Sequence, residues 1–211
     1  MPYAHVRPAL PPQPAPAVPT NGNFSTHDAF SGAVLAPYWV FIRTPREKWY
    51  GLAGALDIRA RPQSIGGSGQ PSFIGRRLQH LWASASTNLH FVPQRDGDAA
   101  GLVAFQNSDY YYFLGLAREG GKLVVCVKKR AGPSDPQDGI IAALVPIDAV
   151  AGAALYLKIE ARGGAYDFYY GTRPDEWTPL LRNADGTILS TKTAGGFVGT
   201  VIGMYAYAAG P

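Results

Sequence analysis

The feature that most constrains the fold is the pattern of short β-branched and aromatic runs that alternate with turn-forming clusters from Thr26 onward. Helical periodicity is almost absent from this part of the chain. The runs predict strands over residues 39–43, 55–60, 76–82, 86–91, 101–106, 110–117, 122–129, 154–161, 165–170 and 200–207. Short strands without intervening helices predict an all-β sandwich of two stacked antiparallel sheets.

Glycine-containing turns separate several of these runs. Residues 95–98, 119–121, 162–164 and 184–186 each supply glycine for a positive φ between apolar stretches, and we interpret them as hairpin turns. In the run 154–161, Leu155, Leu157 and Ile159 alternate with more polar positions. One face of that strand is therefore expected to be buried and the other to be wetter.

Composition indicates one folded domain preceded by a tail. The chain has 211 residues, of which 46% are hydrophobic and 16% charged, which argues against disorder. Residues 8–19 are rich in proline and predict either an extended linker or a strap along the domain. We therefore place a linker or strap at residues 1–25 and the sandwich at 26–211. Such a linker suggests that a preceding domain is missing, although Met1 also allows an independent start.

Charge and cysteine content exclude several classes of protein. The formal charge is +4 and is dispersed along the chain, so we expect no nucleic-acid partner. No apolar run approaches the length of a membrane span, and we expect no membrane partner. The lone cysteine, Cys126, lies in an apolar run and cannot form an intrachain disulfide, and the N-terminus lacks signal-peptide order. These features favour the cytoplasm over secretion.

No catalytic residue can be named from the sequence. The four glutamates (Glu47, Glu119, Glu160 and Glu176) include no paired motif of the kind that glycosidases use. Glu160 and Asp167 flank a turn, and we expect both to be solvated. The histidines lack metal-ligand spacing and no serine lies in a G-x-S-x-G elbow, so we assign no catalytic and no metal site.

Aromatic residues are the remaining candidates for ligand contact. Sugars stack on Trp and Tyr rings, and the candidates are Trp49, Trp82, Tyr110 and Tyr112. Alternation places Tyr110 and Tyr112 on one face of their strand and Tyr111 with Phe113 on the other. One of these pairs is expected in the core and the other on an open sheet face; core packing remains the alternative for each ring.

The segment Phe41-Ile42-Arg43-Thr44-Pro45-Arg46-Glu47-Lys48-Trp49-Tyr50 resembles the F-x-R-T-P-x-x-x-W stretch that opens the C-terminal domain of family 43 glycoside hydrolases, chiefly β-xylosidases and α-arabinofuranosidases. Further similar segments follow in order, including residues 74–80, 100–107 and 199–206. The resemblance extends over residues 24–207.

This resemblance implies a concanavalin A-like jelly-roll sandwich that packs beside a five-bladed β-propeller and supplies no catalytic carboxylate. It also implies that the loop at residues 64–73 borders the propeller's pocket. There the family's aromatic position falls on Gly69, and Phe73 is expected in the following strand. A glycine-rich loop of this kind should be flexible unless another surface holds it.

Four further expectations concern partners and ions. Arg76 and Arg77 point to opposite faces, so either one binds a carboxylate across a domain boundary or both are solvated. Family sandwiches can carry structural calcium, to which Asp28 could contribute, but no full ligand set is visible and no cofactor is predicted. Family members continue into one more strand after the Gly203 strand. A missing last strand would expose a sheet edge and favour a homo-oligomer.

Two functions remain open at this point. The first is a non-catalytic accessory domain of a family 43 hydrolase in xylan breakdown, which predicts an apolar surface that mates with protein. The second is a stand-alone carbohydrate-binding module, which predicts an aromatic groove with affinity for xylo-oligosaccharides.

Overall fold

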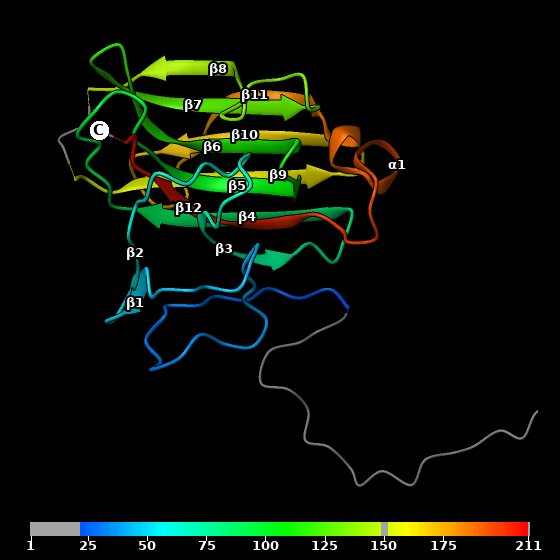
Figure 1. Ribbon diagram of the computed structural model, residues 1–211, viewed down its shortest axis with the longest axis horizontal. Helices are drawn as coiled ribbons and strands as arrows, with labels where there is room; N and C mark the ends of the chain where they lie inside the picture. Colours follow the sequence, from blue (N-terminus) through cyan, green and yellow to red (C-terminus); the bar gives the residue numbers. More distant parts are fainter. Residues whose placement is uncertain (1–21, 149–151, 211) are drawn as a thin grey trace, which may run out of the picture.

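The computed structural model describes residues 22–148 and 152–210 and consists of two stacked antiparallel sheets (Figure 1). The six-stranded sheet has the order β3 (Ser72–Arg77), β12 (Val201–Tyr207), β5 (Ala99–Asn107), β6 (Tyr110–Glu119), β7 (Lys122–Ala131) and β8 (Ile140–Pro146). The four-stranded sheet has the order β11 (Thr178–Asp185), β10 (Ala165–Gly171), β9 (Leu155–Arg162) and β4 (Trp82–Leu89). The concanavalin A-like sandwich predicted from the sequence is confirmed.

Three small elements complete the fold. β1 (Tyr50–Leu52) and β2 (Leu56–Ile58) form a separate two-stranded sheet. The 3₁₀ helix η1 (Gly186–Leu189) and the short helix α1 (Thr191–Ala194) join β11 to β12. Most of the predicted linker, residues 1–21, lies outside the described residues.

The main core lies between the two sheets. β9 alternates strictly between buried and half-buried residues, with Leu155, Leu157 and Ile159 buried as predicted. From the facing sheet, Tyr112 packs its ring against Phe168 with centroids 5.2 Å apart. The alternation of β9 therefore sets which face meets the other sheet.

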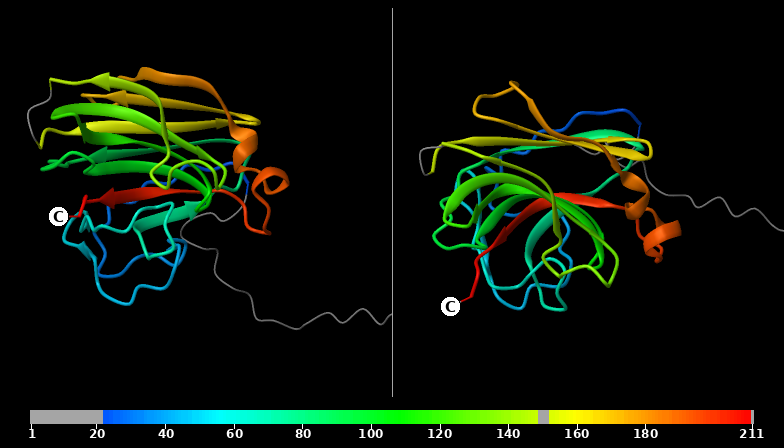
Figure 2. Two further views of the ribbon diagram at one scale, coloured as in Figure 1. Left: turned by 45° about the horizontal axis from the view of Figure 1, so that its top comes forward. Right: turned by 90° about the horizontal axis from the view of Figure 1, so that it is seen from above.

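A second core covers the opposite face of the six-stranded sheet. Phe73, Val103, Tyr111, Phe113 and Tyr205 are buried there. Ile42 and Ile65, from segments before β3, pack into this core, and Figure 2 shows the cyan part of the chain on that side. Both aromatic faces of β6 are thus packed, and the open face expected for one of them is filled by the chain itself.

The strand predictions differ from the structure at the sheet edges. β8 and β11 were not predicted, because residues 140–146 lack polar alternation and residues 178–185 contain Pro179 and several polar residues. Residues 39–43 form only an isolated bridge, Val40 to Gly75. The turns at 119–121 and 162–164 are hairpins, whereas 95–98 joins the two sheets and Asp185 caps η1.

β12 lies inside its sheet, paired with β3 on one side and β5 on the other. The backbone beside it is therefore not left unpaired. Whether a further strand follows in a longer chain stays a prediction.

Candidate domain interface

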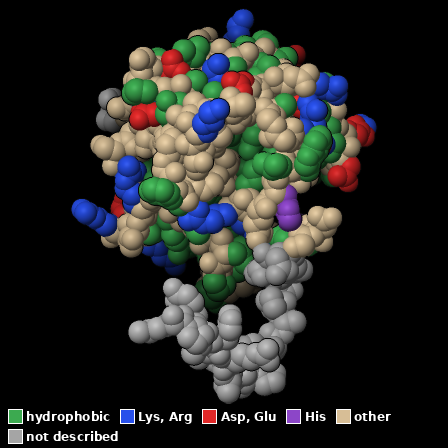
Figure 3. All heavy atoms as spheres, turned by 90° about the vertical axis from the view of Figure 1, so that its right-hand side faces the viewer, with side chains coloured by type: hydrophobic (Ala, Val, Ile, Leu, Met, Phe, Trp, Pro, Cys, Tyr) green, Lys and Arg blue, Asp and Glu red, His purple; other side chains and the backbone are tan. Residues whose placement is uncertain are grey.

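One end of the sandwich gathers several segments that are distant in sequence. The β5–β6 turn, the loop at 64–70, the loop at 132–139 and the η1–α1 segment are joined there by hydrogen bonds. Figure 3 faces this end, where apolar side chains are exposed among polar ones.

The glycine-rich loop at this end is held by the domain itself. The backbone N–H of Ile65 donates to the Tyr205 hydroxyl at 3.0 Å, and Arg130 donates to the Gly66 carbonyl at 2.9 Å. A Cβ at Gly66 would lie 2.1 Å from the Gln137 carbonyl oxygen, so only glycine fits between the two loops. The sequence alone does not say which surface holds this loop. The structure shows that residues of the same domain hold it.

Arg130 is the buried charged residue that holds the glycine-rich loop. It is 5% exposed, donates also to the Ser108 carbonyl at 2.6 Å, and forms an ion pair with Asp109 at 2.9 Å. A buried guanidinium needs such partners because its desolvation is costly. The loop and the β5–β6 turn are therefore fixed relative to each other.

The two pocket-edge candidates, Gly69 and Phe73, differ in their exposure to solvent. Gly69 is exposed, and its carbonyl accepts a hydrogen bond from Arg43. Phe73 lies in β3 as predicted and is 1% exposed, with its ring in the second core. Of the two, only Gly69 is accessible to another molecule.

The sugar-stacking candidates also lie in different environments. Trp49 and Tyr112 are 2% and 1% exposed, which leaves neither ring face open to a sugar. Tyr110 is half-buried against the main core, and Trp82 is 71% exposed at the start of β4. A stacking role stays a prediction for Tyr110 and Trp82, and burial argues against it for the other two.

Large apolar side chains are exposed at the end described above. Phe197 is fully exposed, while Leu81 and Trp82 are 73% and 71% exposed. Leu81 and Trp82 follow β3, and Phe197 precedes β12, which is paired with β3. The N–H of Leu78 donates to the Thr200 carbonyl at 2.9 Å and holds the two segments together. We call the surface formed by Leu81, Trp82, Phe197 and Val198 the end patch.

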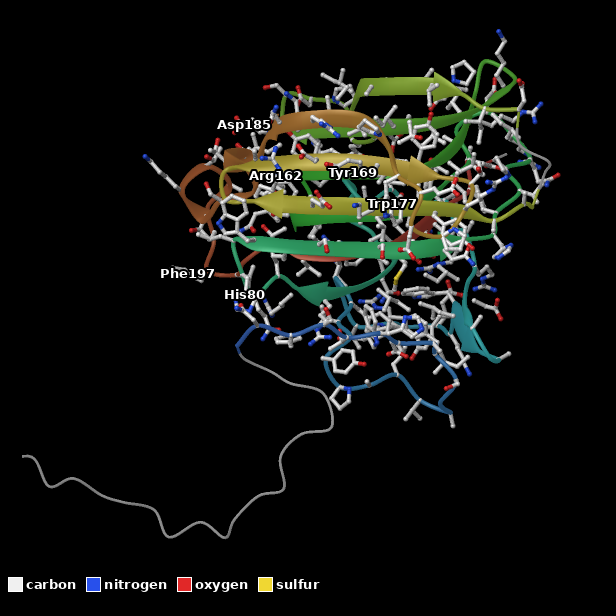
Figure 4. The ribbon with its side chains drawn as sticks, turned by 180° about the vertical axis from the view of Figure 1, so that it is seen from behind. His80, Arg162, Tyr169, Trp177, Asp185 and Phe197 are labelled. Atoms are coloured by element: carbon white, nitrogen blue, oxygen red, sulfur yellow. The ribbon has the colours of Figure 1, made fainter. Side chains whose placement is uncertain are left out.

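The described chain begins beside the end patch. His80 Nε2 lies 2.7 Å from the Gly22 carbonyl oxygen, and its ring packs edge-on against Phe24. His80 and Phe197 lie at the same end of the molecule in Figure 4. Any segment that enters through Gly22 therefore arrives next to exposed apolar side chains.

Arg76 and Arg77 have different roles. The Arg76 guanidinium lies over the rings of Tyr38 and Phe24, at 4.5 Å and 5.4 Å, and donates to Thr26. It fastens the N-terminal segment to β3 through cation–π contacts. Arg77 is exposed, so a carboxylate partner across a boundary stays a prediction for Arg77 alone.

Asp28 stabilises this N-terminal segment. Its carboxylate accepts from the Phe30 N–H, the Tyr38 hydroxyl and Trp39 Nε1 at 2.8–3.0 Å. Burial alone would raise the pKa of Asp28, but these donors outweigh it and lower the pKa. Among residues 22–148 and 152–210, no group of three or more His, Cys, Asp or Glu residues could hold a metal ion.

The expectation that Asp167 is solvated is wrong. Asp167 is 4% exposed and accepts two hydrogen bonds from Arg162 and one from the Asn183 N–H. Burial alone would raise its pKa, but these donors lower it below the ordinary value. Glu160 lies opposite Asp167 and is paired with Lys158 at 2.8 Å. Each carboxylate thus forms a structural ion pair, Asp167 with Arg162 and Glu160 with Lys158. Figure 4 labels Arg162 and Tyr169 on this face of the four-stranded sheet.

A family profile, described as the beta xylosidase C-terminal concanavalin A-like domain, matches residues 27–211. The chain belongs to this family. It is 30% identical over 180 residues to a xylosidase/arabinosidase of Butyrivibrio fibrisolvens, covering 84% of this chain and 33% of that protein. It is 28% identical to a non-reducing end alpha-L-arabinofuranosidase of Bacteroides ovatus, covering 85% of this chain and 33% of that one.

Solved structures give the same result for this chain. It matches the Bacteroides ovatus Xyloglucan PUL GH43B structure with a TM-score of 0.75 at 26% identity, covering 91% of this chain and 38% of the other. It matches a GH43_12 structure from a capybara gut metagenome with a TM-score of 0.75 at 28% identity, covering 84% of this chain and 34% of the other. The chain spans about a third of the curated relatives it matches and corresponds to the C-terminal domain of such enzymes.

No helix in the described part of this domain is long and apolar enough to cross a membrane. In the relatives, a domain of this family pairs with a catalytic domain.

Proposed function

We propose that this chain is a non-catalytic accessory domain that stabilises a five-bladed propeller of a family 43 hydrolase and borders its substrate pocket. The observation that carries the proposal is the end patch, whose four apolar side chains are exposed beside an internally anchored loop. Large exposed apolar patches on soluble domains mark surfaces that bind other proteins. We propose this end as the surface that contacts the propeller.

The rigidity of the loop supports a pocket-edge role. Arg130, Tyr205 and Gln137 fix the loop at 64–67, and Arg43 holds its tip at Gly69. A prepositioned edge loses little conformational entropy when a sugar or another domain approaches. Because Gly69 has no side chain, the edge it offers is backbone and not an aromatic ring.

The filled second core argues against the stand-alone carbohydrate-binding alternative. The sheet face that could form an aromatic groove is covered by the loop that carries Ile65 and by the Gln137 carbonyl, which accepts from Tyr111 at 2.6 Å. Calorimetry with xylobiose and xylotriose, alongside hydrolysis of p-nitrophenyl xyloside, separates the functions. An accessory domain gives neither binding nor turnover, and turnover by the pure chain would refute the proposal.

A chimera tests the docking surface. This chain replaces the matching C-terminal third of the Bacteroides ovatus arabinofuranosidase, and activity and melting are compared with those of chimeras carrying Phe197→Asp or Leu81→Asp. We expect both variants to lower the melting temperature of the propeller. The control is Val34→Asp, an 80% exposed valine in the loop closed by Asp28 and Trp39, which should change nothing. The predicted compartment, the cytoplasm, also remains a proposal.

A further inference from the structure

β8 is an edge strand with exposed apolar side chains and no charged residue. It is hydrogen-bonded to β7 on one side only, and in Figure 1 no described element lies beyond it. Ile140, Ile141 and Leu144 are 50%, 46% and 40% exposed. Residues 140–146 contain no charged side chain. An exposed apolar edge of this kind is a template for another strand.

The other sheet edges are protected. β3 is bridged by Val40 and ends in two arginines. β4 carries alternating serines and Asn88, and β11 carries Pro179, Arg182 and Asp185. Polar and charged side chains at an edge oppose pairing with a second apolar strand. Among the four edge strands of the two main sheets, β8 is therefore the one that carries no polar side chain.

The hydrogen-bonding direction of β8 is fixed by one contact. The Ile147 N–H donates to the Leu123 carbonyl of the β7 side at 3.0 Å. Because alternate residues of an antiparallel strand face opposite neighbours, Val145 also faces β7, and the N–H and C=O of Leu144 face outward. Pro146, the next outward residue, offers only its carbonyl.

We propose that β8 pairs with β8 of a second copy of this chain, antiparallel and centred on Leu144. With a two-fold axis at Leu144, the outward N–H of each Leu144 donates to the outward C=O of the partner's Leu144. This gives two reciprocal hydrogen bonds. In this register Pro146 lies opposite Ala142 of the partner, where the bulge interrupts the regular edge. A register centred on Ala143 would instead bring Asp138 opposite Asp148 and is disfavoured.

The position of β8 makes a second copy the fitting occupant. In Figure 1, β8 and the N-terminal segment lie at opposite edges of the molecule. A domain that enters through Gly22 leaves β8 free, and a strand without charges brings no like-charge repulsion against its own copy. This inference does not depend on the proposed function.

The bulge at Ala142 limits the strength of the dimer. The register with β7 shifts between Val127 and Lys128, so the regular outward edge is short. Small interfaces of this kind are weak and transient, and we expect a dissociation constant on the order of 10–100 µM.

Sedimentation velocity of the 211-residue chain, from about 5 to about 500 µM, tests the inference. We expect a monomer–dimer equilibrium. Leu144→Lys and Leu144→Glu each place like charges opposite each other and should weaken it at least about tenfold. An equimolar mixture of the two variants should restore dimers, because their charges then face each other. Mere loss of folding could not produce that result.

Two further variants complete the test. Leu144→Pro removes only an outward donor, so it should retain the wild-type melting temperature and lose the dimer. Val34→Lys is the exposed control and should dimerise normally. A wild-type chain that stays monomeric throughout, or a dimer lost in Phe197→Lys but kept in Leu144→Lys, would overturn the inference.

Discussion

Substitution of Gly66 by alanine tests how the glycine-rich loop is anchored. The added Cβ would lie 2.1 Å from the Gln137 carbonyl oxygen and 2.8 Å from Arg130 Nη1. Neither neighbour yields easily, because the Gln137 carbonyl accepts from the Tyr111 hydroxyl at 2.6 Å and Arg130 is buried. The loop at 64–67 must therefore move away from the loop at 132–139.

The expected cost follows from three contributions. Overpacking costs about 1–3 kcal/mol, and loss of the hydrogen bond from the Ile65 N–H to the Tyr205 hydroxyl costs about 0.5–1.5 kcal/mol. The lower entropy of the unfolded alanine chain offsets about 0.4–1 kcal/mol. We expect a net loss of about 0.5–4 kcal/mol in the free energy of unfolding, with each kcal/mol lowering the melting temperature by about 2–4 °C.

Chemical denaturation and hydrogen exchange measure this effect. Amide exchange should accelerate at residues 64–70 in Gly66→Ala. The matched control is Gly132→Ala, whose added Cβ meets only the Tyr110 hydroxyl at 3.9 Å, and it should be neutral or slightly stabilising. A change below about 0.5 kcal/mol in Gly66→Ala, the range of ordinary surface substitutions, would refute the anchoring argument.

Three further predictions concern the rest of the domain. Asp98 accepts from three backbone N–H groups, including that of Ala209; burial alone would raise its pKa, but these donors lower it. Its contribution is therefore fully present above the unfolded-state pKa near 3.8 and is lost as the pH falls through the lower folded pKa. In urea titrations, Asp98→Asn should cost about 1–3 kcal/mol at pH 7 and progressively less as the pH falls below 3.8. Leu157→Ala, at a fully buried core position, should cost about 2–5 kcal/mol by urea unfolding, whereas Leu81→Ala should cost under about 0.5 kcal/mol. Burial raises the pKa of Cys126 to about 11, so a thiol reagent at pH 8 should label the unfolded chain and leave the folded chain unreacted.

The sandwich and much of its core were predictable because they follow from local patterns. The alternation at Leu155, Leu157 and Ile159 reports directly which face is buried. Glycines at residues 120–121 and 163 provide the positive φ that their hairpins require. The order of family-like segments, beginning with residues 41–50, led to the domain family that the comparisons confirm.

Edge strands were harder to predict, because an edge is defined by what lies beside it. Nothing in residues 140–146 indicates that β8 has one neighbour, and the polar residues of β11 resemble a loop. The end patch was missed for the same reason. Leu81 and Phe197 are 116 positions apart in the numbering, and only the pairing of β3 with β12 brings their segments to one end.

The sequence by itself determined the inner strands of the two sheets, the hairpin turns at residues 119–121 and 162–164, and the family. These depend on side-chain period and backbone propensity along the chain. Only the tertiary structure decided that Asp167 is buried against Arg162, that the glycine-rich loop is held by Arg130, and that apolar side chains remain exposed at one end. These features depend on contacts between distant segments, and burial is a property of the packed molecule that no single segment encodes.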